Sequence, residues 1–261
     1  MAAGISAKSQ EPMFLIFLEI DGVLIKRDYE TNMKVDDQIR ELRKSCLEYP
    51  NNLLIKRAAT RCFSKTAVDN LMTLIEKVSK VAQIGIVISS SWREEISLED
   101  MQNHMFADTP FGHLIIGKTF DSDFTYQMAK SEGIANLEEE TPSQISSRKY
   151  GFSLAENGVG DIKDREIDFW LRENHENLPI KSFVIIDSED SDISARYPGN
   201  FVYADQETLF SESNAEQAKD ILIKGHFSPS LFPSEQEVEA RRKEAEKFKT
   251  ENDFQFFEGE L

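Results

Sequence analysis

Five short apolar runs, separated by helical patterns, constrain the fold of this chain more than any other feature of its sequence. Each run is nearly continuous in hydrophobicity and rich in Ile, Val or Phe, as in parallel strands that helices cover on both faces. The runs are MFLIFL (13–18), QIGIVIS (83–89), HLIIG (113–117), SFVIID (182–187) and NFVYA (200–204).

The segments between these runs have the periodicity of amphipathic helices. Ser64 is placed to cap a helix over 65–80, one face of which carries the apolar side chains Val68, Leu71, Met72, Ile75 and Val78. Ser213 and Glu216 form the pattern of a capping box before a later helix. Alternating strands and helices predict an α/β fold with a Rossmann-like, doubly wound parallel sheet, which binds ligands at the carboxyl ends of its strands.

The composition agrees with one main soluble domain. The 261 residues are 40% hydrophobic, which is enough to bury a substantial core. Cys46 and Cys62 are not spaced as a metal-binding pair, so we expect reduced structural thiols and a cytoplasmic location. The apolar stretch at 13–18 is too short to span a bilayer, so we expect no membrane span.

The chain is strongly acidic. Its 47 Asp and Glu residues against 30 Lys and Arg residues give a formal net charge of -17. This charge opposes nonspecific attraction to phosphate backbones and to anionic lipids. It therefore argues against a nucleic-acid partner, although a local basic groove would override it.

Polar residues of a consistent kind follow three of the predicted strands. They are Glu19 and Asp21 after the first, Ser89 and Ser90 after the second, and Asp187 and Asp192 after the fourth, with Lys163 and Arg165 opening the helix between the last two. Carboxylates hold a hard cation such as Mg²⁺, and the cation together with a Lys or Arg neutralises phosphate oxygens. In such chemistry one carboxylate attacks phosphorus and another moves the proton. The set predicts Mg²⁺-assisted phosphoryl transfer on a phosphorylated substrate.

In this order the motifs resemble those of the haloacid dehalogenase (HAD) superfamily, whose first motif is Asp-x-Asp-Gly at a strand end. EIDG, IVISSSWR, IKDREIDFWL and VIIDSEDSD resemble the four motifs, and LIIGKTF resembles a short segment after the second. The chain is most similar, over about residues 13–26 and 63–224, to the phosphatase-like branch that includes the HAD domains of multi-module RNA-repair proteins. The resemblance implies a Rossmann-like core, Mg²⁺ and phosphoester hydrolysis through an aspartyl-phosphate.

The resemblance also implies a role for each matching residue. Glu19 takes the nucleophile position and Asp21 that of the general acid and base. Lys163 takes the cationic position, with Arg165 as the alternative, and Ser89, with Ser90 beside it, binds phosphate. The expected metal ligands are Glu19, Asp21 through its backbone carbonyl, Asp187, and Asp192 directly or through water.

Two departures from the family pattern leave the function open. Glu19 replaces the nucleophilic aspartate, and Ser188 replaces the second carboxylate of the fourth motif. The extra methylene moves the carboxylate by roughly 1 Å, which can cost on the order of 10²-fold in an in-line displacement. Metal binding tolerates a re-aimed side chain better. The chain is therefore either a slow or specialised Mg²⁺-dependent phosphatase or a noncatalytic pseudo-phosphatase that binds a phosphorylated ligand or a partner.

Three segments accompany the core predicted at 13–226. Residues 1–12 are expected to form a flexible N-terminus. Residues 27–62 stand where this superfamily inserts a cap, which selects the substrate. Residues 227–261 are expected to form a charged helix with little apolar face, followed by an acidic tail.

A protein partner would bind through the cap or through this C-terminal tail. The glutamate-rich end, ENDFQFFEGEL, resembles the export signals of bacterial type IV secreted effectors. Delivery into a host cytosol is therefore the alternative to a cytoplasmic location, and a solvated tail without a partner is the simpler interpretation.

Overall fold

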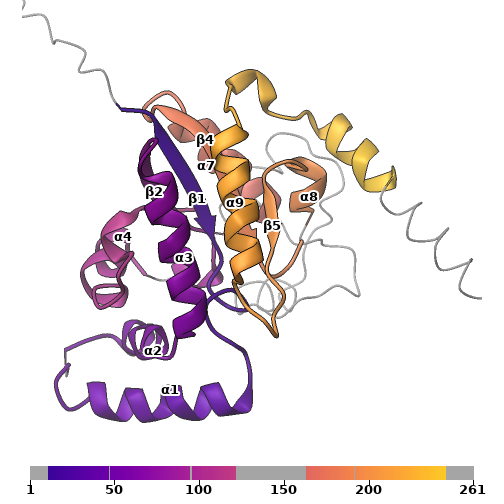
Figure 1. Ribbon diagram of the computed structural model, residues 1–261. Coiled ribbons are helices and arrows are strands. Elements are labelled where there is room, and N and C mark those ends of the chain that lie inside the picture. Colours follow the sequence, from indigo (N-terminus) through magenta and orange to yellow (C-terminus); the bar gives the residue numbers. More distant parts are fainter. Residues whose placement is uncertain (1–10, 47, 95, 122–162, 191, 245–261) are drawn as a thin grey trace, which may run out of the picture.

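The structure is a computed structural model, which describes residues 11–46, 48–94, 96–121, 163–190 and 192–244. Its centre is a five-stranded parallel sheet in the order β3-β2-β1-β4-β5 (Figure 1). The strands are β1 (Met13–Leu18), β2 (Gln83–Ile88), β3 (Ile115–Lys118), β4 (Ile180–Asp187) and β5 (Phe201–Tyr203). The predicted α/β class and Rossmann-like parallel sheet are confirmed. Most of the predicted flexible N-terminus and all of the acidic tail at 251–261 lie outside the described residues.

β1 lies at the centre of the sheet and is covered on both faces. Successive side chains of β1 point to opposite faces of the sheet. One face carries Phe14, Ile16 and Leu18, and the other carries Leu15 and Phe17. All five side chains are fully buried. Such a strand is stable only between two layers of helices, which is why its continuous apolar run predicts a central parallel strand.

Helices cover both faces of the sheet. α3 (Lys65–Val78) and α9 (Glu212–Lys224) lie side by side on one face (Figure 1). α7 (Lys163–Asn174) covers the other face, where the Trp170 ring packs edge-on against Phe17 with 5.4 Å between the ring centroids. The position of α7 matters for function, because it begins at the residue predicted to be the cation of the site.

The two predicted helix starts differ in outcome. Ser64 caps α3, because its Oγ accepts a hydrogen bond from the first turn. The predicted pairing of Ser213 with Glu216 is wrong, since α9 begins earlier and Ser211 forms the capping box with Asn214. Ser213 with Glu216 matches the sequence pattern of a capping box, whereas Ser211 with Asn214 lacks its Glu or Gln, so the local sequence favours the pair that does not form.

Shorter helical segments complete the described part of the chain. They are α4 (Leu98–Asp100), α8 (Ile193–Arg196), a π-helical turn (Met101–Met105), the 3₁₀ turns Ser91–Arg93, Gly112–Leu114 and Pro229–Leu231, and helical residues 235–244. Among the described residues, no helix has both the length and the apolar character that crossing a membrane requires.

The segment predicted to be a cap, 27–62, contains two packed helices, α1 (Tyr29–Leu42) and α2 (Asn51–Thr60). They share a small apolar cluster that includes Leu42, Leu54 and Ala58. Thr60 Oγ1 donates to the Met105 carbonyl at 3.2 Å, which joins α2 to the π-helical turn. In Figure 1 both helices lie beyond the end toward which the β1 arrow points, which is the carboxyl end of the sheet. The role of this insertion as a cap stays a prediction.

Residues 227–244 pack back onto the face of the sheet that α7 covers. Phe227 and Phe232 contact the buried cluster around Phe183, with 6.1 Å between the ring centroids of Phe227 and Phe183. Val238 is only 1% exposed. The charged sequence of this segment does not indicate these contacts, so the predicted end of the core at residue 226 remains to be tested.

Ending the chain after His226 should lower the free energy of unfolding by about 3 kcal/mol or more, because the packing of two partly buried phenylalanines and of the buried Val238 is lost. Urea-induced unfolding compares this variant with the full chain and with one ending at Glu244. The last keeps every contact described for 227–244 and should unfold almost like the full chain. Equal midpoints for all three would show that 227–244 adds nothing to the folded core.

Candidate active site

Three charged side chains meet at the carboxyl ends of the central strands. The Nζ atom of Lys163, the first residue of α7, lies 2.5 Å from Glu19 Oε2 and 3.0 Å from Asp187 Oδ2. Glu19 follows β1 and Asp187 ends β4, and these strands are neighbours where the strand order reverses. Open parallel sheets bind ligands at this point. The structure thus brings together three of the residues that the sequence predicts for the site.

Burial and Lys163 together set the ionisation of the two carboxylates. Burial alone would raise the pKa of Glu19, but the Lys163 ammonium, the Ser90 hydroxyl and the Ile20 N–H more than offset it and lower that pKa to about 2. Burial raises the pKa of Asp187 to about 7, a rise that Lys163 opposes and the Glu19 charge increases. The single ammonium therefore stabilises an ionised Glu19 more than an ionised Asp187.

The carboxylate of Glu19 turns back toward its own backbone. Its Oε1 accepts hydrogen bonds from the N–H groups of Ile20 at 2.9 Å and Asp21 at 3.3 Å. Its Oε2 faces the Lys163 ammonium. Both oxygens at the family's nucleophile position therefore have partners within the protein.

Asp21 lies next to this cluster and has partners of its own. Its Oδ2 accepts hydrogen bonds from Trp92 Nε1 at 2.9 Å and from Arg27 Nη2 at 3.0 Å. Its backbone carbonyl, an expected metal ligand, accepts from Ser188 Oγ at 3.0 Å. Gly22 makes the following turn at φ 73°, and a Cβ there would lie 2.4 Å from the same Oγ. Ser188, where the family pattern has a carboxylate, therefore holds the loop of the first motif.

Buried hydroxyl groups follow β2 and β3. Ser89 and Thr119 are 0% and 1% exposed, and no described residue gives either hydroxyl oxygen a hydrogen-bond partner. The Thr119 N–H donates to the Ile88 carbonyl at 3.0 Å, which places Thr119 beside the end of β2. Buried hydroxyls without partners are unfavourable, and phosphate oxygens would satisfy them. This supports the predicted role of Ser89 and adds Thr119 to the candidate site.

Arg93 ties the second motif to α7. Its guanidinium is nearly fully buried, and its Nη2 lies 2.5 Å from Glu166 Oε2. It also donates through Nε to the Phe120 carbonyl and through Nη1 to the Ser89 carbonyl, both at 3.1 Å. Because Glu166 is in the first turn of α7, Arg93 helps to position Lys163.

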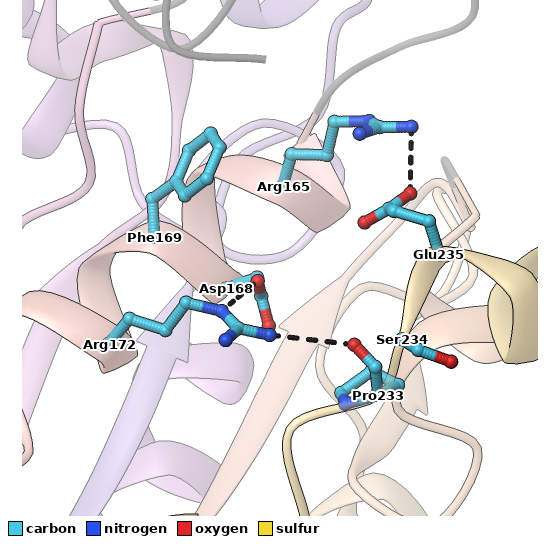
Figure 2. Close-up of a pocket in the computed structure, with 7 residues that line it drawn as sticks. All are labelled: Arg165, Asp168, Phe169, Arg172, Pro233, Ser234 and Glu235. Atoms are coloured by element: carbon cyan, nitrogen blue, oxygen red, sulfur yellow. Dashed lines mark hydrogen bonds and ion pairs between the residues drawn. The ribbon is translucent and has the colours of Figure 1, made fainter. Parts of the chain in front are cut away.

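Two of the predicted site residues bind elsewhere. Asp192 forms an ion pair with Arg242 at 2.9 Å. Arg165 pairs with Glu235 at 3.0 Å, beside a small pocket between α7 and residues 233–235 (Figure 2). The other residues lining this pocket are Asp168, Phe169, Arg172, Pro233 and Ser234, and each lining arginine is paired with a carboxylate. The structure therefore does not bring Asp192 or Arg165 to the Lys163 cluster, and their site roles stay predictions.

Glu19 and Asp187 are the residues that fit a Mg²⁺ ion. Their carboxylates share one cation, the Lys163 ammonium, so oxygens from both reach a common point. Within the described ranges, no group of three or more His, Cys, Asp or Glu side chains is arranged to hold a metal. Two carboxylates suffice for Mg²⁺, which often takes one or two and completes its shell with water and phosphate oxygens.

The sequence from β1 to α9 matches a family model described as the HAD domain in Swiss Army Knife RNA repair proteins, over residues 15–215. The chain belongs to this family. The matched span of this HAD domain includes Glu19, Lys163 and Asp187, and it confirms the resemblance that the motifs indicate. Comparison with curated proteins and with solved structures gave no match. The family supports a phosphatase-like hydrolase at a general level.

Sequence reasoning missed three residues of the HAD domain that enter the site. Arg27 and Trp92 bind the Asp21 carboxylate, and Thr119 adds a buried hydroxyl. Each lies within or directly beside a recognised motif, and that proximity is the signal that could have found them. Their roles depend on how the motifs meet in space, which the spacing along the chain does not show.

Arg93→Met should lower the free energy of unfolding by about 3–5 kcal/mol, because it removes the buried ion pair with Glu166 and the hydrogen bonds from Arg93 to two carbonyls. The matched control is Lys77→Met, which breaks the exposed ion pair with Glu216 and should change stability by about 1 kcal/mol or less. Denaturant titration measures both variants. A loss as small as that of the control would mean that the buried pair does not hold α7.

Proposed function

We propose that this HAD domain is a Mg²⁺-dependent phosphohydrolase that acts on phosphomonoesters and is slow on generic ones. The observation that carries the proposal is the meeting of Glu19, Lys163 and Asp187, with Asp21 beside them. The set combines two carboxylates for a metal, a cation for the phosphate and a carboxylate for proton transfer. The family match supports phosphatase-like chemistry, and the metal and the substrate are our proposals.

The chain offers a partner for each part of a bound phosphate. Mg²⁺ held by Glu19 and Asp187 would offset the charge on the phosphate oxygens. The Lys163 ammonium, already between these carboxylates, would neutralise a further oxygen. Ser89 and Thr119 would donate their buried hydroxyls, which have no partner among the described residues.

Hydrolysis would proceed in two displacements. A Glu19 carboxylate oxygen attacks phosphorus and forms a glutamyl phosphate, while the bond from phosphorus to the alcohol oxygen breaks and Asp21 gives that oxygen a proton. Water then attacks phosphorus, Asp21 takes a proton from it, and the bond to Glu19 breaks to release phosphate. Asp21 suits this role because Trp92 and Arg27 hold its carboxylate outside the Lys163 cluster.

The contacts of Glu19 are the reason to expect slow turnover. Before attack, Oε1 must leave two backbone N–H groups or Oε2 must leave Lys163. The side chain is also longer by one methylene than the family's aspartate. A misplacement of about 1 Å can lower the rate on the order of 10²-fold.

The alternative function is a noncatalytic protein that binds a phosphorylated ligand at the same residues. Two observations favour it: both Glu19 oxygens have partners, and Asp192 is paired with Arg242. A protein partner would then bind through 27–62 or the C-terminal segment. The proposed location is the cytoplasm or, for a secreted effector, a host cytosol.

Mg²⁺ should raise the melting temperature, because the ion binds a site that exists only in the folded state. Asp187→Asn should remove most of this rise, since it takes away one of two carboxylates. Asp192→Asn is the control and should keep the rise, because Asp192 is paired with Arg242 instead. Differential scanning fluorimetry during a Mg²⁺ titration of metal-free protein compares the three chains, and an unshifted wild type would contradict the metal site.

Glu19→Asp should raise the hydrolysis of para-nitrophenyl phosphate by about 10-fold or more, because the shorter side chain corrects the position of the attacking oxygen. Adding Asp21→Asn should abolish the gain, since the proton carrier is lost. Steady-state rates in Mg²⁺ measure both variants. Fast hydrolysis by the wild type with slower hydrolysis by the Glu19→Asp variant would show that the site is rebuilt around glutamate. If both proteins bind Mg²⁺ but neither hydrolyses the ester, the result would favour the noncatalytic alternative.

A further inference from the structure

Lys56 brings a second lysine to the candidate active site, and it comes from the insertion. It lies in α2, and its Nζ is 4.6 Å from the centroid of the Trp92 ring. The indole Nε1 of that ring donates to Asp21 Oδ2 at 2.9 Å. Trp92 therefore connects Lys56 with the carboxylate that we assign to proton transfer.

The electrostatics agree with this placement of Lys56 near Asp21. Burial lowers the pKa of the Lys56 ammonium, and the carboxylate that opposes this most strongly is Asp21, ahead of Glu19. Lys163, by contrast, contacts Glu19 and Asp187 directly. The two lysines thus reach different parts of the site: Lys163 contacts the two carboxylates proposed for the metal, and Lys56 lies over the ring that bonds to Asp21.

Lys56 makes no direct ion pair with a residue that the structure describes, although the Asp21 and Glu19 carboxylates favour its charge. Its side chain is half-buried, and its close contact is the face of the Trp92 ring. Lys34, in the same insertion, is exposed and pairs with Glu30 at 2.8 Å. A partly desolvated ammonium without an ion pair gains more from an anionic ligand than an exposed, paired one does.

The alcohol portion of a phosphomonoester would lie on this side of the site. The proton from Asp21 goes to the alcohol oxygen, so that oxygen must approach the Asp21 carboxylate. Arg27 bonds to Asp21 Oδ2 at 3.0 Å, whereas Lys56 lies over the Trp92 ring that donates to the same oxygen. Lys56 is the one of the two without such a bond.

We propose that Lys56 selects phosphomonoesters whose alcohol portion carries a negative charge, such as a carboxylate. The inference rests on the proposed phosphohydrolase function, because that function places the alcohol beside Asp21. Lys56 is thus a specificity-determining residue that the insertion supplies to the edge of the sheet. Its charge favours one class of small acidic phosphoesters over uncharged ones.

The test compares the binding of 2-phosphoglycolate with that of ethyl phosphate, which is similar in size and lacks the carboxylate. Isothermal titration calorimetry in Mg²⁺ should show that the wild type binds 2-phosphoglycolate at least about 10-fold more tightly. Lys56→Met keeps an apolar side chain over Trp92 and should lose this preference, while Lys56→Arg should keep most of it. Lys34→Met is the matched control from the same insertion and should bind like the wild type.

A wild type without the preference, or a Lys56→Met variant that keeps it, would overturn the assignment. Equal weakening of both ligands in Lys56→Met would also overturn it, because that result indicates a structural role. Binding does not depend on turnover, so hydrolysis in the same mixtures judges the phosphohydrolase function separately. Circular dichroism shows that each variant is folded.

Discussion

Two buried carboxylates at the ends of neighbouring strands depend on one ammonium group between them. Glu19 and Asp187 are 4% and 0% exposed, and a charge buried at either position without a partner would be strongly destabilising. Lys163 contacts both carboxylates, so the site requires α7 to begin at this position. Arg93 and Glu166 form the buried ion pair that joins the first turn of α7 to the ends of β2 and β3. The two buried carboxylates at the edge of the sheet are therefore stable only when α7 packs in this position.

Much of the fold and the centre of the site could be predicted from the sequence because their signals are local. The run at 13–18 indicates a covered strand without any knowledge of its neighbours, and the same holds for the other strands. Carboxyl ends of parallel strands meet at one edge, so polar residues that follow buried runs are expected to converge. Glu19 and Asp187 meet in this way, and Lys163 reaches them from the start of its helix.

The remaining features depend on pairings between distant segments, which periodicity does not encode. Asp192 is predicted as a metal ligand from its place in the motif, and the sequence gives no sign of its ion pair with Arg242 of the C-terminal helical residues. Lys56 looks like any surface lysine of a helix until the Trp92 ring lies beneath it. The burial of Val238 is equally hard to predict, because one apolar residue among charged ones does not form an apolar face along a helix.

The phenylalanines that pack against β4 come late in the chain. The family match ends at residue 215, yet Phe227 packs against Phe183 of β4, and Val238 is buried further along. A growing chain on the ribosome therefore exposes part of the apolar surface around Phe183 after every strand of the sheet has been made. This surface closes only once Phe227 and Phe232 have emerged. Until then the nascent HAD domain exposes apolar surface of the kind that promotes aggregation and that chaperones bind.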